Sequence, residues 1–569
     1  MDNRGFIPGI WEVEINVNDF LNLNRNQLNG DLKVEHFKMS IPNDYDLIRD
    51  NKKLFAYLKA FHEENMLMYD YDYELFISEE KYTLYTNTSD KKKFMDIGLI
   101  VKTSDEERKS FIHPDLCVIP LYGTKYLIKT LKQYIKDLDK QFQTQEWIHR
   151  KIENHRSILA IQEFEEFALR QGINVRRPCK NSIEVANVIW LESIYSNLEN
   201  DKIPVVFNNI FDFIDIFLER DLKNGTIDEV SAQQIIDELY CKLAALQKKN
   251  KYQGRFNHSI VLDTSKLNNT TYRLLSSAVK YKEFNAPFQL IFSGEGLSDE
   301  IINNLKELFD KEHPLSISKV KDGIDIYNSS LNSSHLFFKS FEDISMMFAS
   351  FDLYKGLITA LNGGKDIATN INVQQVTKGL MDKELSYEAI MNQMELFFKY
   401  YITLYTEYTN SYAYYFDMFH NLPFRNSLIS SYPYYLMNLS FHNVSSTVKI
   451  LNAVKKGKFE VVRNDKGFIE KVIPLIEEHS SSVENDIHKI IHQETKRMLF
   501  YKNGHFNLVF FEHNAFFEQG NSNVVSNMNQ RLPSNMVLAD TIKLNTTEFN
   551  SYLSNFGTSP YSYIQLYKS

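Results

Sequence analysis

Cysteine is nearly absent from this chain of 569 residues, which contains only Cys117, Cys179 and Cys241. Their spacing matches neither a zinc-binding pair nor a disulfide framework, so we expect no metal site and no disulfide. This usage is typical of a reducing compartment, and we expect a cytoplasmic protein. The first residues show no basic-then-apolar leader, and no apolar run approaches the ~20 residues that span a bilayer, so no membrane partner is expected.

Glycine is also scarce, at 20 residues, which is about half of the usual ~7% share. Loops that hold phosphates or a backbone radical use glycine heavily, so this composition disfavours them. No nucleophile elbow, P-loop or dinucleotide fingerprint occurs. The net charge of −9 is spread without a basic block, and we therefore expect no nucleic acid partner.

Hydrophobic residues make up 43% of the chain, including 41 Phe and 33 Tyr, which is enough for a large aromatic core. No internal repeat or flexible linker divides the chain, so we expect one domain over residues 1–569. Within that domain we distinguish an N-terminal helical lobe at 1–145, a core at 146–535 and a divergent C-terminal tail at 536–569.

Apolar residues at helical spacing predict two packed helices within 207–243. Gly225 suits a left-handed helix stop, and Thr226 and Glu229 have the spacing of a capping box for the second helix. The same reasoning predicts a strand at 11–17, helices at 52–67, 148–171, 181–198, 298–309, 348–361, 387–412 and 438–454, strands at 287–293 and 506–511, and a hairpin over 459–472.

Several segments resemble the pyruvate formate-lyase family of glycyl radical enzymes in their order and spacing. Residues 217–225 read Phe-Leu-Glu-Arg-Asp-Leu-Lys-Asn-Gly, which is similar to the family's Tyr-Ile-Glu-Arg-Asp-Leu-Lys-x-Gly. Further motifs similar to those of the family are Leu-Tyr-Gly at 121–123, Arg-Pro at 177–178 and Ala-Leu-Asn-Gly-Gly at 360–364. The resemblance covers residues 5–21 and about 113–530, with gaps, whereas residues 22–110 match the family poorly.

This resemblance implies an α/β fold in which about ten strands, in two antiparallel half-barrels, form a barrel surrounded by helices. The family's Arg-Val-Ser-Gly-Tyr loop, which carries the radical, has no counterpart after Gly520, where Gly557 is the remaining glycine. We therefore expect the C-terminal radical loop to be missing. The family commonly forms homodimers, so the resemblance also implies a homodimer or a protein partner.

The resemblance also implies where a site would lie. In the family, a cysteine pair receives the radical from glycine, and two arginines hold the substrate. Counting back without a gap from the match at Asn362 places serines at the cysteine positions and at one arginine position. The loop before the match at 217–225 has asparagine at the other arginine position, and the strand at 287–293 has phenylalanine where the family has tryptophan. The expected vestigial pocket positions are Ser333, Ser334, Asn209, Ser350 and Phe292. We expect no catalytic residue, no metal and no cofactor.

The expected function is that of an inactive pyruvate formate-lyase-like pseudoenzyme that binds a partner protein or a small ligand. Two alternatives stay open: a formate acetyltransferase-type radical enzyme whose glycyl radical comes from a second chain, and a non-radical enzyme that reuses the barrel pocket. The spacing of Glu484, His488 and His492 suits a shared metal, but the HExxH pattern is absent, so we expect a solvated helix face.

Overall fold

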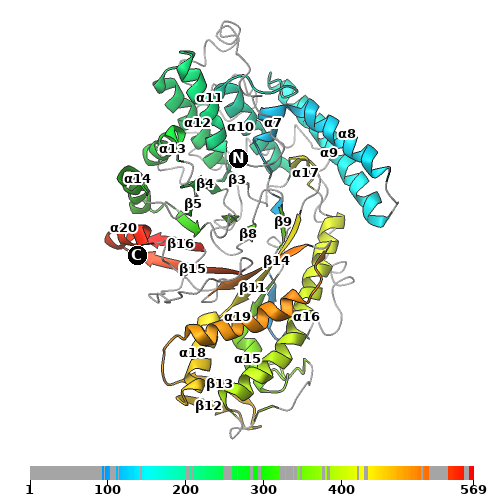
Figure 1. The fold of residues 1–569 in the computed structure, drawn as a ribbon, viewed down its shortest axis with the longest axis vertical. Coiled ribbons are helices and arrows are strands. Elements are labelled where there is room, and N and C mark those ends of the chain that lie inside the picture. Colours follow the sequence, from blue (N-terminus) through cyan, green and yellow to red (C-terminus); the bar gives the residue numbers. More distant parts are fainter. Residues whose placement is uncertain are drawn as a thin grey trace.

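In the computed structural model, a mixed sheet lies between an upper and a lower group of helices (Figure 1). The structure describes residues 93–568 except 95, 103–110, 113, 141–143, 200–204, 208–209, 248–258, 265–266, 282–285, 293–296, 314, 320–326, 329–336, 339–342, 347–348, 374–378, 381–384, 420–421, 429–433, 502–503, 512–535 and 556–562. The predicted α/β class is confirmed. No helix in this part of the chain is long and apolar enough to cross a membrane.

The strands of the described residues are short. They are β1 (Ile100–Lys102), β2 (Phe111–Ile112), β3 (Val206–Phe207), β4 (Ser259–Asp263), β5 (Phe288–Phe292), β6 (Leu315–Lys319), β7 (Tyr327–Asn328), β8 (Phe337–Phe338), β9 (Asp343–Met346), β10 (Ala349–Asp352), β11 (Tyr434–His442), β12 (Phe459–Arg463), β13 (Ile469–Pro474), β14 (His505–Phe511), β15 (Met536–Leu544) and β16 (Tyr563–Lys568).

The helices are longer and carry most of the predicted apolar stripes. They are α7 (Val118–Tyr122), α8 (Thr124–Leu138), α9 (Gln145–Arg170), α10 (Ser182–Glu199), α11 (Ile210–Lys223), α12 (Glu229–Gln247), α13 (Asn269–Lys280), α14 (Asp299–Asp310), α15 (Leu353–Leu361), α16 (Tyr387–Phe419), α17 (Pro423–Ser427), α18 (Val444–Lys455), α19 (Ser481–Lys496) and α20 (Thr546–Asn555).

The main sheet consists of two parallel halves that run in opposite directions. Its strand order is β1-β10-β11-β14-β15-β16-β6-β5-β4-β3. Strands β10, β11, β14, β15 and β16 are mutually parallel, as are β6, β5, β4 and β3, and the two runs meet antiparallel at β16 and β6. Among the described residues no ladder joins β1 to β3, so the closed barrel stays a prediction.

Each half of the sheet turns an apolar face toward its own helices. In the lower half, Phe351 packs on Phe398 of α16, and Phe510 packs on His488 of α19, with ring centroids 5.6 and 4.1 Å apart. In the upper half, the ring of Phe288 lies parallel to that of Tyr240 of α12 at 6.3 Å. The core therefore lies between sheet and helices, and the other face of the sheet points away from both helical groups.

The two helices predicted within 207–243 are confirmed as α11 and α12, and Gly225 between them has a φ of 69°. The predicted cap of α12 is wrong. Asp228, and not Thr226, receives the backbone N–H and the hydroxyl of Ser231, at 2.8 and 2.6 Å. The helix consequently begins at Glu229.

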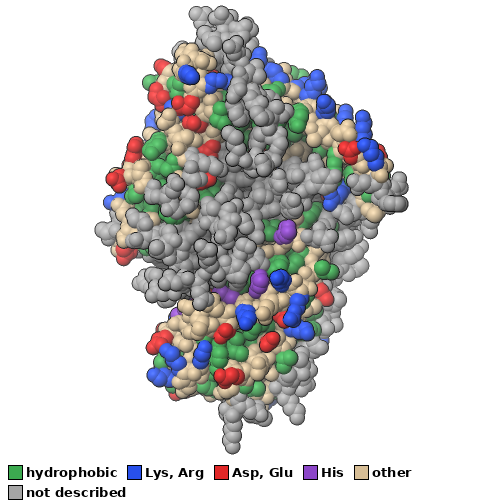
Figure 2. Space-filling model, in the orientation of Figure 1, with side chains coloured by type: hydrophobic (Ala, Val, Ile, Leu, Met, Phe, Trp, Pro, Cys, Tyr) green, Lys and Arg blue, Asp and Glu red, His purple; other side chains and the backbone are tan. Residues whose placement is uncertain are grey.

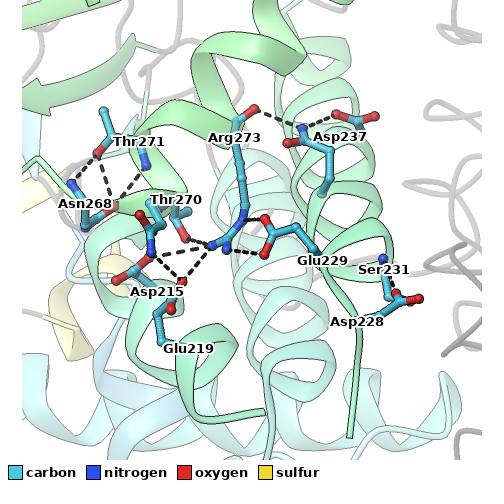
Figure 3. Close-up of polar contacts among 12 residues, drawn as sticks. Asp215, Glu219, Asp228, Glu229, Ser231, Asp237, Asn268, Thr270, Thr271 and Arg273 are labelled. Atoms are coloured by element: carbon cyan, nitrogen blue, oxygen red, sulfur yellow. Dashed lines mark hydrogen bonds and ion pairs between the residues drawn. The ribbon is translucent and has the colours of Figure 1, made fainter. Parts of the chain in front are cut away.

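A buried arginine ties α11, α12 and α13 together (Figure 3). Arg273 of α13 donates to both carboxylate oxygens of Glu229 at 2.7 and 2.9 Å, and to Glu219 of α11 at 3.0 Å. Asp215, one turn before Glu219, accepts the backbone N–H of Thr270 at 3.0 Å. These contacts fix how the segment that resembles the family most closely packs against the next helix of the upper group.

Two predicted helices begin with strands. Residues 349–352 form β10 before α15 starts at Leu353, and residues 434–442 form β11 before α18 starts at Val444. The predicted helices over 348–361 and 438–454 are therefore wrong in their first residues. Both errors fall where a parallel strand leads into a helix with at most one residue between them.

Other predictions on the elements are confirmed or lie outside the described residues. The helices at 148–171, 181–198, 298–309 and 387–412, the strands at 287–293 and 506–511 and the hairpin over 459–472 are all present. The segments at 5–21 and 52–67, and Gly557, lie outside the described residues. The predicted tail at 536–569 supplies β15, α20 and β16, and these two strands join the halves of the sheet.

Charges of both signs are interspersed over the visible face of the molecule (Figure 2). Lysine side chains nevertheless gather over α8, where Lys125, Lys129, Lys132 and Lys136 are exposed on the side opposite the core. Opposite them, Leu127 and Leu131 of the same helix are buried. The absence of a basic block in the sequence thus coexists with one basic helix surface.

Candidate functional site

Strands β10 and β11 bring two distant parts of the chain together. Ser350 lies opposite Ser440, and Asp352 lies opposite His442 in the parallel ladder. Each strand leads almost directly into a helix, α15 after β10 and α18 after β11. Because the strands are parallel, their carboxyl ends and the N-termini of both helices meet at one edge. Ligands commonly bind at such an edge, and helix N-termini favour negative charge there.

Tyr405 of α16 fastens the two strands to each other. Its hydroxyl donates to the carbonyl oxygen of Ala349 at 2.6 Å and accepts the backbone N–H of Ser440 at 3.1 Å. Burial raises the pKa of Tyr405 although the bond from Ser440 acts against this rise, so the phenol stays protonated. The spacing of Ser350 and Ser440 is thus held from the apolar side of the sheet.

The hydroxyl of Ser350 lies in the middle of a chain of polar groups. Its Oγ is 2.8 Å from Nδ1 of His442 and 2.9 Å from Oγ of Ser440. Nε2 of His442 lies 3.4 Å from Oδ2 of Asp352. Ser350, Ser440 and His442 are each at most 1% exposed. The arrangement joins a buried hydroxyl to a carboxylate through one imidazole.

Asp352 is oriented by two amide donors besides the imidazole of His442. Its Oδ1 caps α15 by accepting the backbone N–H of Lys355 at 2.9 Å, and its Oδ2 accepts Nδ2 of Asn443 at 3.1 Å. Burial raises the pKa of this carboxyl, but the bond and charge of His442 and the two amides outweigh burial and hold the pKa below its ordinary value. Asp352 is therefore a fixed anion.

The turn between β11 and α18 is unusual in its backbone. Asn443 has a φ of 61° and a ψ of 34°, a left-handed conformation that asparagine tolerates better than most residues. In this conformation Asn443 reaches Asp352, while the residue before it, His442, points to Ser350. Backbone conformations of this kind cluster at functional sites.

The order of these groups suits proton transfer. The carboxylate of Asp352 favours the His442 tautomer that carries its proton on Nε2. Nδ1 then accepts the proton of the Ser350 hydroxyl, which is the arrangement of a general base beside a nucleophile.

Several polar residues share the strand face of Ser350 in the lower half, together with the buried apolar Leu436 and Val509. Alternation and register place these residues on the face opposite the helices, and the polar ones are Ser350, Asn438, Ser440, His442 and Asn507. Nδ2 of Asn507 donates to Oδ1 of Asn438 at 3.2 Å. Oδ1 of Asn507 has no hydrogen-bond partner among the described residues. An unpaired buried acceptor of this kind costs about 1–3 kcal/mol, so a donor supplied by a ligand would stabilise it.

The same face continues into the upper half. The register through β15 and β16 leads from Asn507 to Gln289, Ser316 and Ser318 of β5 and β6. Nε2 of Gln289 donates to Oγ of Ser318 at 3.1 Å. These residues, like those of the lower half, are at most 1% exposed. Buried polar residues therefore recur on one face across both halves of the sheet, among apolar residues such as Val509 and Ile291; we call this set of polar residues the polar sheet face.

Of the five predicted pocket positions, Ser350 lies on the polar sheet face. Phe292 is 8% exposed and ends β5 on the same side as Phe288, toward the helices, and not on the side of Gln289. Asn209, Ser333 and Ser334 lie outside the described residues. Of the described pocket positions, Ser350 and Phe292 therefore lie on opposite faces of the sheet.

Sequence reasoning missed the partners of Ser350, which are Ser440, His442 and Asp352. A signal existed in Leu-Ser-Phe-His at 439–442, where apolar and polar residues alternate as in a strand. That alternation puts Ser440 and His442 on one face. Nothing in the sequence pairs this strand with residues 349–352.

The predicted solvated face of α19 is wrong. Glu484 and His488 are 0% and 3% exposed, because they point to β14 and to the preceding loop. Oε2 of Glu484 lies 3.2 Å from Nε2 of His479, and its Oε1 lies 3.8 Å from Nε2 of His488. Burial lowers the pKa of His488 to about 4, although the charge of Glu484 acts in the opposite direction. No cluster of histidine, cysteine and carboxylate side chains in the described part of the chain is arranged to hold a metal.

The three cysteines are free and buried in the helical shell or beside it. Cys117 precedes α7, Cys179 precedes α10 and Cys241 lies in α12. Burial, with the charges of Glu184 and Glu192, raises the pKa of Cys179 well above its ordinary value. None of these thiols lies on the polar sheet face.

The family profile and the sequence relatives of this chain all point to one family of proteins. The sequence profile of a family described as pyruvate formate lyase-like matches residues 52–261. The chain is 21% identical over 397 residues to the PFL-like enzyme TdcE of Escherichia coli K12, and 22% identical over 397 residues to formate acetyltransferase 1 of the same organism. Each match covers 65% of this chain and 51% of the relative. The chain thus spans about half the length of these curated relatives.

Solved structures share the fold at low identity. The B12-independent glycerol dehydratase of Clostridium butyricum superposes with a TM-score of 0.63 at 13% identity, covering 86% of this chain and 77% of the dehydratase. Hydroxyproline dehydratase of Clostridioides difficile gives 0.64 at 12%, covering 86% and 78%. A glycyl radical enzyme of Archaeoglobus fulgidus gives 0.58 at 12%, covering 96% and 93%. At these identities the superpositions concern the fold alone.

Proposed function

We propose, from the premise that this chain belongs to the pyruvate formate lyase-like family, that it binds a small hydroxylated ligand on the polar sheet face and performs no radical chemistry of its own. In this sense it is a pseudoenzyme of the family. The observation that carries the proposal is the polar sheet face itself, whose side chains are at most 1% exposed. Buried polar groups cost free energy unless each one is paired, so a face of this extent is expected to serve binding.

The absence of a thiol is the reason for excluding radical chemistry. A glycyl radical abstracts hydrogen from a thiol because the S–H bond is close in strength to the glycyl Cα–H bond, whereas a serine O–H bond is much stronger. The family register places Ser333 and Ser334 at the thiol positions, and no cysteine occurs between Cys241 and Ser569. The buried thiols of the helical shell do not replace the missing pair.

The shape of the ligand site follows from the sheet. Helices cover the apolar face of both halves, yet the opposite face is buried as well. We propose that the two halves curl toward each other into the barrel of about ten strands that the resemblance implies, with the polar sheet face inside. Oδ1 of Asn507 could accept a hydrogen bond from a hydroxyl group of the ligand.

Of the two alternative functions, the radical enzyme is disfavoured and the non-radical enzyme is supported. A second chain that supplies a glycyl radical would still find serine, and not cysteine, at positions 333 and 334, which disfavours the radical enzyme. A non-radical enzyme is supported by the Ser350–His442–Asp352 chain. A homodimer or another protein partner stays a proposal.

Two measurements test the proposal. The first incubates the anaerobic protein with a radical-SAM activating enzyme, records electron paramagnetic resonance and then adds pyruvate and coenzyme A. We expect neither a glycyl doublet nor formate above a no-protein control, and either signal would refute the proposal. The isolated activating enzyme and an active formate acetyltransferase serve as negative and positive controls.

The second measurement follows thermal unfolding with glycerol and trans-4-hydroxy-L-proline, the compounds that the two dehydratases of similar fold bind. A bound ligand raises the unfolding temperature in proportion to the logarithm of its concentration above the dissociation constant. We expect a rise with at least one of these compounds and its loss in Asn507→Leu, which removes the unpaired acceptor. A panel without any rise, or an equal rise in Asn507→Leu, would contradict binding on the polar sheet face.

A further inference from the structure

We propose that Ser350, His442 and Asp352 form a catalytic site that hydrolyses a short-chain carboxylic ester, with Ser350 as the nucleophile and His442 as the general base. This inference rests on the proposed function, because the ester must reach the polar sheet face. The hydroxylated ligand proposed above is then the alcohol product of the reaction.

The geometry meets the requirements of an activated serine. Nucleophile and base must lie within hydrogen-bond reach, and Oγ of Ser350 is 2.8 Å from Nδ1 of His442. The base must be oriented by a third group, and Nε2 of His442 lies 3.4 Å from Oδ2 of Asp352. Catalytic contacts of this second kind are often long before substrate binds.

The surroundings of the three residues also fit this chemistry. The site lies at the carboxyl ends of β10 and β11, where the N-termini of α15 and α18 converge. Their dipoles favour the negative charge that develops on an ester oxygen during attack. His442 is 1% exposed, so interactions inside the site are strengthened by the low local dielectric constant.

Hydrolysis proceeds in two steps, formation of an acyl-enzyme and its cleavage by water. Oγ of Ser350 bonds to the acyl carbon, the ester C–O bond breaks, and the serine proton passes through Nδ1 of His442 to the leaving alkoxide, which departs as the alcohol. Water then attacks the acyl-enzyme and gives a proton to His442. The bond from the acyl carbon to Oγ breaks, Oγ regains its proton, and a carboxylic acid leaves. Asp352 keeps its charge throughout and acts as a positioning residue.

The test uses the full chain and two probes. Diisopropyl fluorophosphate should phosphorylate Ser350 with loss of fluoride, as located by peptide mass spectrometry, and 4-nitrophenyl acetate should be hydrolysed. Ser350→Ala should abolish both. His442→Gln should lower both rates by about 100-fold or more, the range of general base catalysis. Asp352→Asn retains the helix cap, because asparagine also caps well, and should lower kcat while leaving KM unchanged.

Controls separate a catalytic from a structural role. Ser193→Ala is the matched control, because Ser193 is equally buried but donates only to a helix carbonyl, that of Ile189 at 2.7 Å. This variant should label and hydrolyse like the wild type. Thermal unfolding confirms that each variant is folded, and in Asp352→Asn a loss of stability without a loss of kcat would show a structural role only.

Three results would overturn the inference: no label on Ser350, a label on another residue, or an undiminished rate in folded His442→Gln. Any of them, with no glycyl signal and with ligand-induced stabilisation intact, would leave the proposed binding role standing. A glycyl doublet would instead refute the proposed function, whatever the labelling shows. The two failures are thus distinguishable.

Discussion

Arg273 offers the sharpest test of how the upper helical group is held together (Figure 3). The substitution Arg273→Met removes the guanidinium but keeps most of the apolar stem. The variant loses the two bonds to Glu229 and the bond to Glu219, which link α13 to α12 and α11. It also leaves these carboxylates, with Asp215 nearby, without their common cation.

The expected cost follows from burial. The Arg273 side chain is 6% exposed, whereas those of Glu229 and Glu219 are 66% and 40% exposed. Breaking a fully buried pair costs about 3–5 kcal/mol, and an exposed pair is worth about 1 kcal/mol or less. Since one partner is buried and the others are partly solvated, we expect Arg273→Met to lower the free energy of unfolding by about 2–3 kcal/mol.

Urea unfolding followed by circular dichroism measures this loss, and the same helix provides a control. Lys280 of α13 also forms an ion pair, with Asp237 at 2.7 Å, but the lysine side chain is 58% exposed, and the buried Asp237 keeps its hydrogen bonds from Gln233 and Ser277 when the lysine is removed. Lys280→Met should therefore cost less than about 1 kcal/mol. Equal losses in the two variants, or no loss in Arg273→Met, would refute the reasoning. In a double-mutant cycle with Glu229→Gln, a coupling energy near zero would show that the bidentate pair contributes nothing.

Three further predictions concern stability. Burial lowers the pKa of His313 to about 4, so its stabilising contribution is complete above about pH 6.5 and is lost as the pH falls toward 4, by up to about 1.4 kcal/mol per pH unit. Urea unfolding from about pH 7 to about pH 5 measures this slope; His313→Phe should reduce it, and an unchanged slope would contradict the assignment. Tyr405→Phe should cost about 1–3 kcal/mol in the same assay, because it leaves two backbone groups of β10 and β11 without their partner, and a neutral result would show that water replaces the phenol. Gly123→Ala should destabilise more than Gly172→Ala: both glycines have positive φ, but an added Cβ at Gly123 would lie 2.6 Å from a backbone oxygen, whereas that at Gly172 meets nothing within 4 Å. Equal melting temperatures for the two variants would argue against this close approach.

Local patterns in the sequence were sufficient to predict most of the helices and the family resemblance. The apolar stripes of α9, α11 and α16 repeat at helical spacing over long stretches, so neighbouring residues alone specify these elements. The same holds for the turn of the hairpin over 459–472, where Gly467 has a φ of 81°. Motifs shared with the family, such as the one at 217–225, lie in these locally specified segments. The resemblance could therefore be recognised from the sequence without a structure.

Which residues form the site depends on tertiary contacts between distant segments of the chain. Strand β10 consists of Ala349–Asp352, and its four residues continue without a break into an apolar helix, so the local pattern reads as helix throughout. Such a strand is stabilised by its ladder to β11 and by Tyr405, which no local pattern reveals. The sequence singled out Ser350 by counting from a family motif. It gave no reason to join Ser350 to His442, which lies 92 positions later in the chain.

Burial of polar groups was likewise a tertiary outcome. Glu484 and His488 are polar residues on the same stripe of α19 as the apolar Val483, Ile487 and Ile491. In the fold that stripe meets β14 and the loop with His479, so both side chains are buried. Periodicity determines which side chains share a face of a helix or a strand, but what covers that face is determined by segments distant in sequence. The polar sheet face has the same origin, because its residues are buried together only once the ladders have set their register.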